Sequence, residues 1–368
     1  MTRPVWEIPV GRFSILERVE LLFSQPISFV SRFQSEPQSG WFLNGSFIWE
    51  TNLLPEKEEA WFIGDIPVVF FEEGLSQKDF ADQKQLAKIL LKKKKKQIQG
   101  IYLKYIFDYI KYQNQFLLKD LKNQKQSDYN FSQSIVIGDK NKIAIHPQAK
   151  VWPGSVFDTR EGEIFIDHDA EIIPPSLIQG PCYIGKKVLI DAAKIRPNNS
   201  FFEGCKISGE VADSIFLEYV NKHHDGFIGH SLIGSFVNFG AMSTNSDLKN
   251  NYSSIKVFLN GEWIDSGEIK IGIFSGDHSK FGIGSLMNSG SIFGTGCNLF
   301  SNQGLFPKFV PSFSWGNGID FKKYVWNDFL ENTKKILKRR KKELSHEMIL
   351  RLKQIYDSIE VKKNETGF

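Results

Sequence analysis

The chain has 368 residues, of which 41% are apolar, and carries a formal net charge of +4. This length and composition allow a sizeable core and two domains, so we expect a globular protein and not a disordered one. Its three cysteines, Cys182, Cys205 and Cys297, have no paired spacing. That pattern argues against a disulfide framework or a cysteine-based zinc site and favours a reducing cytoplasm.

The N-terminus lacks an apolar run of signal-peptide length, and no later segment reaches the roughly 18 apolar residues of a membrane span. The excess positive charge lies in two lysine-rich runs, at 92–96 and 338–342. Neither run carries the interleaved aromatic or polar side chains that read nucleic acid, so basic faces of amphipathic helices explain them better. We therefore expect a cytoplasmic protein with no membrane span and no nucleic-acid partner.

The first 125 residues predict an α/β unit. Apolar runs at 41–43 and 66–71 are each followed by turn residues, which is typical of strands. From about residue 78 the pattern becomes helical, and it includes an aromatic-rich helix over 101–110. The polar stretch 122–130 is predicted to be a linker.

An aliphatic residue at every sixth position dominates the segment 131–316. A period of six fits neither an α-helix, which repeats every 3.6 residues, nor an ordinary strand, which repeats every two. It predicts a parallel β-helix, in which one aliphatic side chain per side points into the axis. The repeat is carried by Ile166, Ile172, Ile178, Ile184 and Ile190, then by Phe227, Ile233 and Phe239, and finally by Phe281, Met287, Phe293 and Leu299.

The repeat is broken over 242–268, where Asn260-Gly261 between two apolar flanks is a strong hairpin signal. We expect an excursion that leaves the β-helix and returns, and such loops often carry function. Two apolar stripes predict helices within 317–368, with Ser345 as an N-cap between them. These helices are expected to cap the end of the β-helix.

Several unusual polar strings give the chain a resemblance to a known family. The longest is NKHHDGFIG at 221–229, and others are LKNNY at 248–252, GDHSK at 276–280 and PSFSWG at 311–316. With the N-terminal TRPV, they resemble the bacterial bifunctional N-acetylglucosamine-1-phosphate uridyltransferase and glucosamine-1-phosphate acetyltransferase family. The likeness is to a branch with a short, divergent sugar-nucleotidyltransferase domain.

The resemblance implies a divergent α/β nucleotidyltransferase-like domain over 1–125, a left-handed parallel β-helix over 131–316, and C-terminal helices over 317–368. It also implies a homotrimer, because family members form the acyl-CoA cleft between neighbouring β-helices. The implied activity is acetyl transfer from acetyl-CoA to an amino-sugar phosphate, in the synthesis of UDP-N-acetylglucosamine-type cell-envelope precursors.

The acetyltransferase residues of the family can be matched one by one. His224 and Asn238, fourteen residues apart, match its general base and an Asn that holds the substrate or the oxyanion. Histidine suits a base because its unperturbed pKa of about 6.5 lets it take a proton from a sugar ammonium. Arg196 resembles the sugar-phosphate-binding arginine, whose guanidinium can grip a phosphate with two hydrogen bonds. Further expected substrate contacts are Lys222, Asn250, Lys256, Asp277 and His278.

Each assignment has a structural alternative. His224 could form a hydrogen bond at a corner or at a subunit interface, Asn238 could serve a tight turn, and Arg196 could be a solvated corner residue. Phe227 stands where the family has a substrate-binding tyrosine, so one polar contact is missing. A degenerate sugar-nucleotide-binding or scaffolding homologue is the alternative function.

The nucleotidyltransferase half departs further from the family. The chain opens at a point where the family's strand and Gly-rich loop have already ended, and Arg3 and Asn44 are expected remnants of that half. Ser46 stands where relatives carry the aspartate for Mg²⁺, and a hydroxyl replaces a carboxylate poorly on a hard cation. Either the true start lies upstream of Met1 or nucleotidyl transfer is lost. Mg²⁺ is expected only if nucleotidyl transfer, a further alternative as the main activity, is retained.

Overall fold

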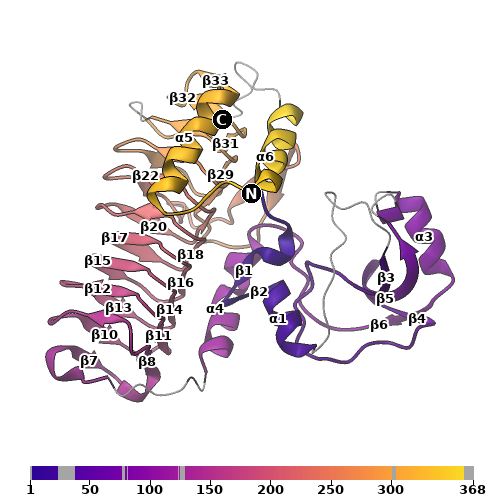
Figure 1. Ribbon diagram of the computed structural model, residues 1–368, viewed down its shortest axis with the longest axis horizontal. Coiled ribbons are helices and arrows are strands. Elements are labelled where there is room, and N and C mark those ends of the chain that lie inside the picture. Colours follow the sequence, from indigo (N-terminus) through magenta and orange to yellow (C-terminus); the bar gives the residue numbers. More distant parts are fainter. Residues whose placement is uncertain are drawn as a thin grey trace. The chain divides into compact units, whose positions relative to one another are not determined.

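The computed structural model describes residues 2–23, 38–76, 79–80, 82–122, 124, 129–300 and 304–359. The predicted linker at 122–130 and the end of the predicted C-terminal helices, 360–368, lie partly or wholly outside these residues. The chain divides into two compact units. One unit comprises Arg3–Pro9 and Phe13–Asp108, and the other comprises Thr2, Val10–Arg12 and the described residues from Tyr109 onward (Figure 1).

The larger unit is a parallel β-helix, as the six-residue repeat predicted, with three faces per coil. The first face contains β9 (Lys150–Val151), β12 (Glu171–Ile173), β15 (Leu189–Ile195), β17 (Lys206–Ala212), β19 (Asn221–Lys222), β22 (Asn238–Phe239), β27 (Lys280–Phe281), β30 (Asn298–Leu299) and β32 (Ser314–Gly316). The second face contains β7 (Ile135–Ile137), β10 (Val156–Asp158), β13 (Leu177–Gln179), the later parts of β15 and β17, β20 (Phe227–Gly229), β23 (Thr244–Asn245) and β28 (Leu286–Met287). The third face contains β8 (Ile143–Ile145), β11 (Ile164–Ile166), β14 (Cys182–Ile184), β16 (Asn199–Phe201), β18 (Ile215–Phe216), β21 (Leu232–Ile233), β26 (Ile273–Ser275), β29 (Ser291–Phe293) and β31 (Phe309–Val310).

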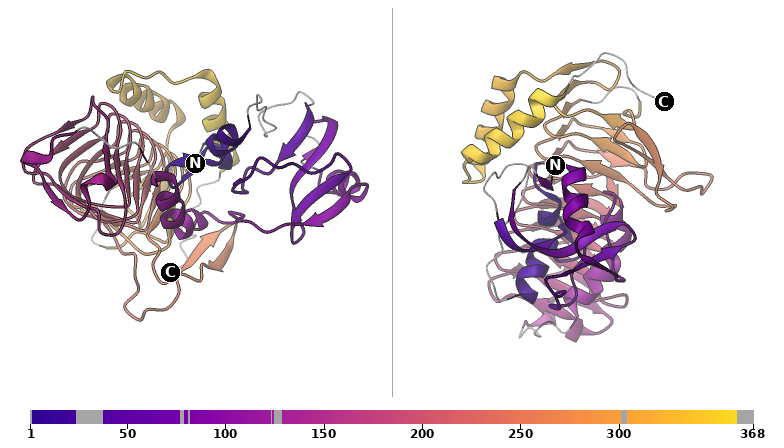
Figure 2. Two further views of the ribbon diagram at one scale, coloured as in Figure 1. Left: turned by 90° about the horizontal axis from the view of Figure 1, so that it is seen from below. Right: turned by 90° about the vertical axis from the view of Figure 1, so that its right-hand side faces the viewer.

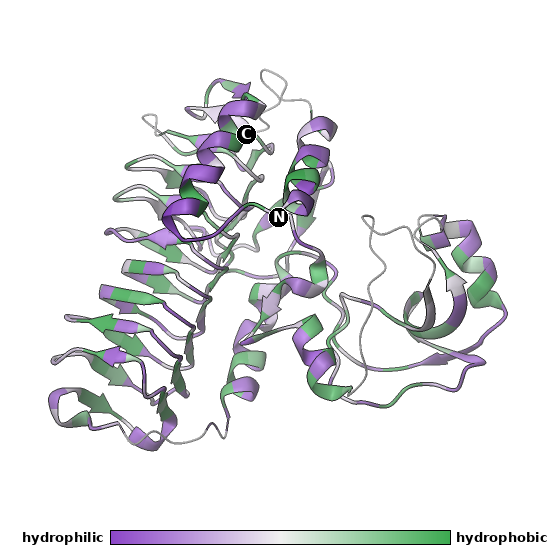
Figure 3. Ribbon diagram, viewed as in Figure 1, coloured by the Kyte–Doolittle hydropathy of each residue, from purple (hydrophilic) through white to green (hydrophobic). Residues whose placement is uncertain are grey.

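The repeat residues form the core of this β-helix. Ile166, Ile172, Ile178, Ile184 and Ile190 are all 0% exposed, and each stacks on its counterpart in the next coil. Later coils replace aliphatics by aromatic rings, and Phe239 and Phe281 stack with ring centres 4.9 Å apart. Along the strands, hydrophobic and hydrophilic residues alternate, as expected when one side faces the axis and the other faces outward (Figure 3).

The predicted excursion leaves the coils without disturbing their register. Ile233 pairs directly with Ser275, although the excursion lies between them in sequence. β24 (Lys256–Leu259) and β25 (Glu262–Asp265) form an antiparallel hairpin, with Asn260 and Gly261 at positive φ at its tip, as the Asn-Gly signal predicted. Figure 2 shows this hairpin standing away from the coils.

Part of the third face, around β14 and β16, is covered by α4 (Asp108–Leu121). Leu117 and Leu121 pack against Tyr183, next to two partly buried phenylalanines. The side chain of Gln113 donates to Ser200 Oγ over 2.8 Å and accepts from the backbone of Gly11 over 2.7 Å. The helix is therefore fixed to the coils by both apolar and polar contacts.

The smaller unit contains η1 (Val5–Glu7), β2 (Phe13–Ser14), α1 (Ile15–Leu22) and α3 (Gln83–Leu91), while β1 (Pro9–Val10) spans the boundary between the units. Ser14 and Glu17 form a capping box at the start of α1. A four-stranded sheet has the order β3 (Gln38–Leu43), β5 (Ile66–Leu75), β4 (Glu59–Ile63) and β6 (Lys94–Gln97).

Two local predictions for this region were wrong. The lysine run at 92–96 was expected on a helix, but most of it forms the edge strand β6, where Lys95 and Lys96 lie over the rings of Phe62 and Trp61. Charged side chains on an edge strand discourage pairing with other chains. The helix expected over 101–110 begins only at Asp108, because the backbone of residues 101–103 pairs with that of residues 46–48.

The C-terminal helices are α5 (Trp326–Arg339) and α6 (His346–Ser358), and Ser345 caps α6 as predicted. Both helices contact Phe313 of the last coil through Phe329 and Tyr356, as expected for a cap at this end of the β-helix. Phe329 of α5 also reaches His278 at a corner of the coils. That corner carries stacked rings, with Tyr219 on Phe236 and Phe236 on His278 at 5.0 and 5.2 Å between ring centres. The remaining short elements are η2 (Phe131–Gln133), η3 (Lys140–Lys142) and β33 (Phe321–Lys323), which pairs with β32.

The ring stack is interrupted at Gly296, where the next coil has no side chain. A Cβ atom at this position would lie 3.0 Å from the ring of Phe329 on α5. Phe329 is fully buried and contacts His278 and Phe313 edge-on, at 6.2 and 5.0 Å between ring centres. The missing side chain thus gives α5 its attachment point.

Candidate functional site

A groove of about 650 Å³ opens on the second face of the β-helix. Its floor consists of outward-facing side chains from successive coils. They are Leu177, Lys194, Glu210, Phe227 and Thr244. Pro175, Ala192, Ala193, Gly209, Asp225 and Gly226 form the rest of the lining.

The corner between the first and second faces borders this groove. In the coil of β19 and β20 the corner is the four-residue loop His223–Gly226, whereas the preceding coil turns with only Ser208 and Gly209 between the two faces. Gly209 has a φ of +71°, and a Cβ atom there would lie 2.7 Å from Lys222 Nζ and 2.8 Å from the carbonyl oxygen of Gly226. Only glycine fits this short corner without strain.

Lys222 lies inside the coil. It is 2% exposed and occupies a position where its register partner in the preceding coil is Ile207. Its ammonium donates to the carbonyl oxygens of Ser208 and His224, over 2.7 and 2.8 Å. Burial disfavours the charged form and lowers the pKa of Lys222 to about 8. Lys222, which the sequence analysis places among the substrate contacts, holds the backbone of the corner loop.

The two histidines of the loop have different surroundings. His223 Nε2 lies 2.8 Å from a carboxylate oxygen of Asp191, which is two coils earlier on β15. The ring of His224, the predicted base, is exposed, and its centre is 6.3 Å from that of His223. One ring is thus held by a carboxylate, and the other is exposed to solvent.

Arg196 lies next to the groove and makes an ion pair with its floor. Its Nε donates to Glu210 Oε1 over 2.8 Å, and Lys194 Nζ lies 3.6 Å from Glu210 Oε2. Two cations therefore share one carboxylate. Both pairs are partly exposed, and exposed ion pairs stabilise a protein by only about 0–1 kcal/mol.

Asn238 lies one coil further along the first face. Its Oδ1 accepts a hydrogen bond from the side chain of Asn221 over 2.9 Å, and its register partner in the following coil is Lys280. Burial lowers the pKa of Lys280 to about 8. No local pattern marks Lys280, because its burial depends on neighbours from other coils.

Four of the predicted substrate contacts lie away from the groove. Asp277 is buried and accepts hydrogen bonds from the backbone of Ser235 over 2.8 Å and from the hydroxyl of Thr2 over 2.7 Å. His278 is buried in the corner stack beneath α5. Asn250 and Lys256 are exposed on the excursion.

The predicted nucleotidyltransferase remnants lie in the smaller unit. Asn44 closes a turn after β3, because its Oδ1 accepts from the backbone of Ser46 over 2.9 Å and its amide donates to the carbonyl of Pro67 over 3.0 Å. Arg3 is half-buried in the same unit. Among the described residues, no three or more histidine, cysteine or acidic side chains are placed to hold a metal ion. Asn44 and Ser46 offer an amide and a hydroxyl where a hard cation such as Mg²⁺ prefers a carboxylate, so we derive no step through it.

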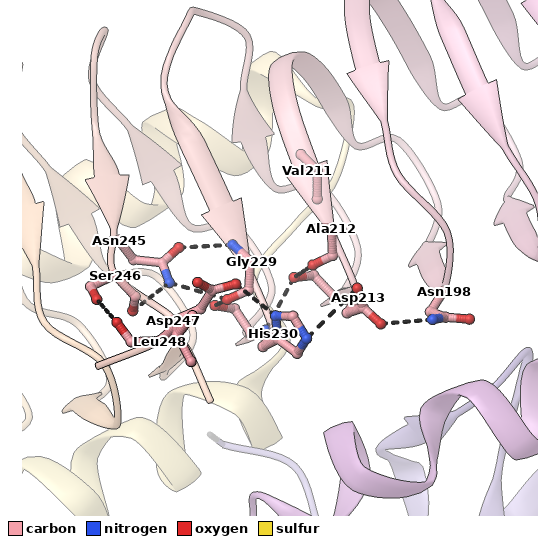
Figure 4. A network of polar contacts seen from close by, with 12 residues as sticks. Asn198, Val211, Ala212, Asp213, Gly229, His230, Asn245, Ser246, Asp247 and Leu248 are labelled. Atoms are coloured by element: carbon pink, nitrogen blue, oxygen red, sulfur yellow. Dashed lines mark hydrogen bonds and ion pairs between the residues drawn. The ribbon is translucent and has the colours of Figure 1, made fainter. Parts of the chain in front are cut away.

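A ladder of polar side chains lies at the corner between the second and third faces, and it was not predicted from the sequence (Figure 4). His230 Nδ1 lies 2.7 Å from Asp247, its Nε2 lies 3.7 Å from Asp213, and Asp213 accepts from the amide of Asn198 over 2.7 Å. Asp247 stands at the start of the excursion, so the ladder fixes the point where the chain leaves the coils. The available signal was the spacing, since His230 and Asp247 are 17 residues apart, about one coil.

In the described part of the chain, no helix is both long and apolar enough to cross a bilayer. Together, the register of the coils and the groove at a corner loop define a hexapeptide-repeat parallel β-helix with a candidate site on one face.

No family model matches the chain. Among curated proteins it is similar to a bifunctional sugar-1-phosphate nucleotidylyltransferase/acetyltransferase of Sulfurisphaera tokodaii, with 34% identity over 126 residues, which is 33% of this chain and 31% of that protein. It is also similar to the bifunctional protein GlmU of Methanococcus maripaludis, with 30% identity over 118 residues, covering 30% and 28% of the two chains. The resemblance predicted from the polar strings is confirmed by these names. The chain spans about a third of the length of the curated relatives it matches.

Solved structures with a similar arrangement include a hexapeptide transferase family protein from Anaplasma phagocytophilum, with 10% identity, coverage of 59% of this chain and 93% of that chain, and a TM-score of 0.26. Another is the UDP-N-acetylglucosamine acyltransferase of Francisella novicida, with 17% identity, coverage of 61% and 79%, and a TM-score of 0.24. The fold assignment itself rests on the strand register.

Proposed function

We propose that the protein is a transferase that moves an acyl group, acetyl in the simplest case, from acyl-CoA to the amine of an amino-sugar phosphate. The observation that carries the proposal is a groove lined by Lys194, Glu210 and the end of the His223–Gly226 loop, with Arg196 paired to Glu210 beside it. The curated relatives support it, since their names combine sugar-1-phosphate nucleotidyl transfer with acetyl transfer.

The chemistry requires a base beside the acceptor. An ammonium must lose a proton before its nitrogen can attack the thioester carbonyl, and histidine is suited to take that proton near neutral pH. A histidine of the corner loop would do so, and His224 is the one that the sequence predicts. Asn238, on the neighbouring coil, would hold the substrate or donate to the oxyanion that forms on the thioester.

The cations near the groove would bind the phosphate. Arg196 and Lys194 share Glu210, and a phosphate dianion can compete for a guanidinium held in a partly exposed pair. Lys222 would act from inside the coil by holding the carbonyl of His224. Phe227 on the groove floor offers an apolar surface and no hydroxyl.

The assembly belongs to the same proposal. A homotrimer would place a neighbouring β-helix beside each groove and complete a cleft for acyl-CoA. The supply of acyl-CoA suits a cytoplasmic setting. Nucleotidyl transfer is not proposed, because Asn44 closes a turn with Ser46 and this pair offers an amide and a hydroxyl in place of a carboxylate.

The test is release of the CoA thiol from acetyl-CoA in the presence of glucosamine-1-phosphate, followed with a thiol reagent. The three cysteines of the chain are fully buried, so they contribute little background. We expect release that depends on both substrates and falls in His224→Ala. The matched control is His346→Ala, because His346 is an exposed histidine on α6, away from the groove-lining residues.

Binding of acetyl-CoA or a sugar nucleotide without turnover would instead favour the binding or scaffolding alternative. Failure to bind acetyl-CoA at millimolar concentration would reject the proposed function.

A further inference from the structure

We propose that His223, held by Asp191, is the imidazole that takes the proton from the acceptor amine, and that His224 contacts the substrate. This inference rests on the proposed function and refines its mechanism. It replaces the sequence-based choice of His224 as the base.

The geometry of the pair favours His223. Its Nε2 lies 2.8 Å from Asp191 Oδ2, a distance typical of a charge-assisted hydrogen bond. Both side chains are about one-third exposed, at 30% for His223 and 35% for Asp191. The pair is therefore ordered but still open to solvent and to a substrate.

The pair lies beside the groove, at the corner between the first and second faces, and its chain neighbours line the groove. Ala192 and Ala193, which follow Asp191 in sequence, line the groove, and so do Asp225 and Gly226 of the corner loop. Asp191 and His223 belong to the coils on either side of the short corner at Ser208 and Gly209. A side chain at Gly209 would meet Lys222 and the backbone of Asp225 and Gly226, so glycine at this position leaves room for the loop that carries His223.

The carboxylate would fix the tautomer of the ring. With Nε2 donating to Asp191, the neutral ring carries its lone pair on Nδ1, which is then the atom that accepts the proton. The same carboxylate stabilises the imidazolium that results. Lys222, through its hydrogen bond to the carbonyl of His224, limits movement of the loop that carries both rings.

The proton and electron balance closes without another reactant. The acceptor ammonium gives its proton to Nδ1 of His223, and the freed nitrogen lone pair forms a bond to the thioester carbonyl carbon. The tetrahedral intermediate expels the CoA thiolate as the carbon–sulfur bond breaks. The imidazolium returns its proton to the thiolate, which restores neutral His223, and the amide nitrogen loses its remaining extra proton to solvent.

The experiment compares acetyl transfer by the native chain and by His223→Ala, His224→Ala and Asp191→Asn, each with and without added free imidazole. We expect kcat of His223→Ala to fall about 10²-fold or more, as general-base loss does, and to recover in part with imidazole. His224→Ala should mainly raise KM and gain nothing from imidazole. Asp191→Asn should lower kcat at least about tenfold with little change in KM.

The opposite pattern would overturn the assignment. If His223→Ala keeps its kcat while His224→Ala loses kcat and is rescued by imidazole, His224 is the base. Thermal unfolding of each variant shows whether a lost kcat comes from a lost fold, and imidazole rescue can occur only in a folded protein.

A second measurement separates this inference from the proposed function. Nitrogen-15 chemical shifts of the histidine rings report which nitrogen of His223 carries the hydrogen in the native protein and in Asp191→Asn. If the native chain transfers no acyl group, the proposed function fails and the catalytic role of His223 fails with it, even where the shifts show the pairing. If the native chain is active and the shifts show no Nε2–H form of His223, the inference alone fails.

Discussion

The ammonium of Lys222 lies 2.7 Å from the carbonyl oxygen of Ser208, inside the coil, and beside Ile207 in the preceding turn of the chain. A charged group in this position is costly to bury, and it remains because it holds two backbone carbonyls of a glycine-dependent corner. The corner loop with the two histidines is thereby connected to the core.

The first prediction concerns alkaline pH. The pKa of Lys222 is about 8 in the folded protein against 10.5 ordinarily, so the unfolded chain binds more protons between these values. Stability should therefore rise as pH increases from about 8 to about 10.5, while below about 8 the full cost of the buried ammonium remains. The rise due to Lys222 is at most about 3 kcal/mol.

Urea unfolding at pH 7.5 and pH 10 checks this prediction, with native protein, Lys222→Met and the exposed-lysine control Lys256→Met. The gain between the two pH values should be smaller in Lys222→Met than in the native protein and unchanged in Lys256→Met. Lys280, whose pKa is also lowered to about 8, contributes in the same direction in all three proteins. Equal gains in native protein and Lys222→Met would contradict the prediction.

A second prediction tests the short corner at Gly209. Gly209→Ala should lower the free energy of unfolding by about 2–4 kcal/mol, because it adds a clash with Lys222 and Gly226 to the strain of a positive φ. Gly267 has the same φ of +71° but no atom within 4 Å of a Cβ. Gly267→Ala is therefore the matched control and should cost only about 1–2 kcal/mol. Similar costs for both variants in chemical denaturation would show that the corner is not crowded.

A third prediction concerns the ladder around His230. Asp247→Asn removes the charge 2.7 Å from His230 Nδ1 while keeping the shape of the side chain, and should cost about 1–3 kcal/mol. Glu262→Gln on the exposed hairpin should change stability by less than about 0.5 kcal/mol. The measurement is the unfolding midpoint in urea. A cost for Asp247→Asn no larger than that of the control would mean that the ladder contributes nothing.

A fourth prediction concerns the attachment of α5. Phe329 is fully buried and contacts His278 and Phe313. If the C-terminal helices unfold together with the coils, Phe329→Ala should lower the free energy of unfolding by about 3–5 kcal/mol. Leu350→Ala, at an exposed position of α6, is the control and should be nearly neutral. Limited trypsin digestion gives an independent readout, since the lysine-rich α5 should be cut faster in Phe329→Ala alone.

The inward-facing half of the structure was predictable from sequence. The six-residue spacing of Ile166 to Ile190 indicates which side chains face the axis, and the Asn260-Gly261 pair indicates the hairpin. Both patterns involve residues close together in sequence, so they can be recognised without knowing any long-range contact. The lysine run of β6 was assigned to a helix because its strand pairing with β4 depends on residues far away in sequence.

The site was predictable only in part. The polar string around His224 pointed to the corner loop that borders the groove, but the partners of its side chains come from other coils. Asp191 lies 32 residues before His223, and nothing local marks it as a partner. Lys222 and Asp277 were expected at the substrate, and their burial could not be anticipated because polar residues seldom occupy inward positions.

Because Ile233 pairs directly with Ser275, the coils before and after the excursion are adjacent and in register. The hairpin tip at Asn260-Gly261 is therefore a place where the polypeptide can be lengthened at small entropic expense, about 0.6 kcal/mol for each doubling of the loop. A fluorescent label or a short peptide inserted there would report on this protein while leaving its repeating architecture intact.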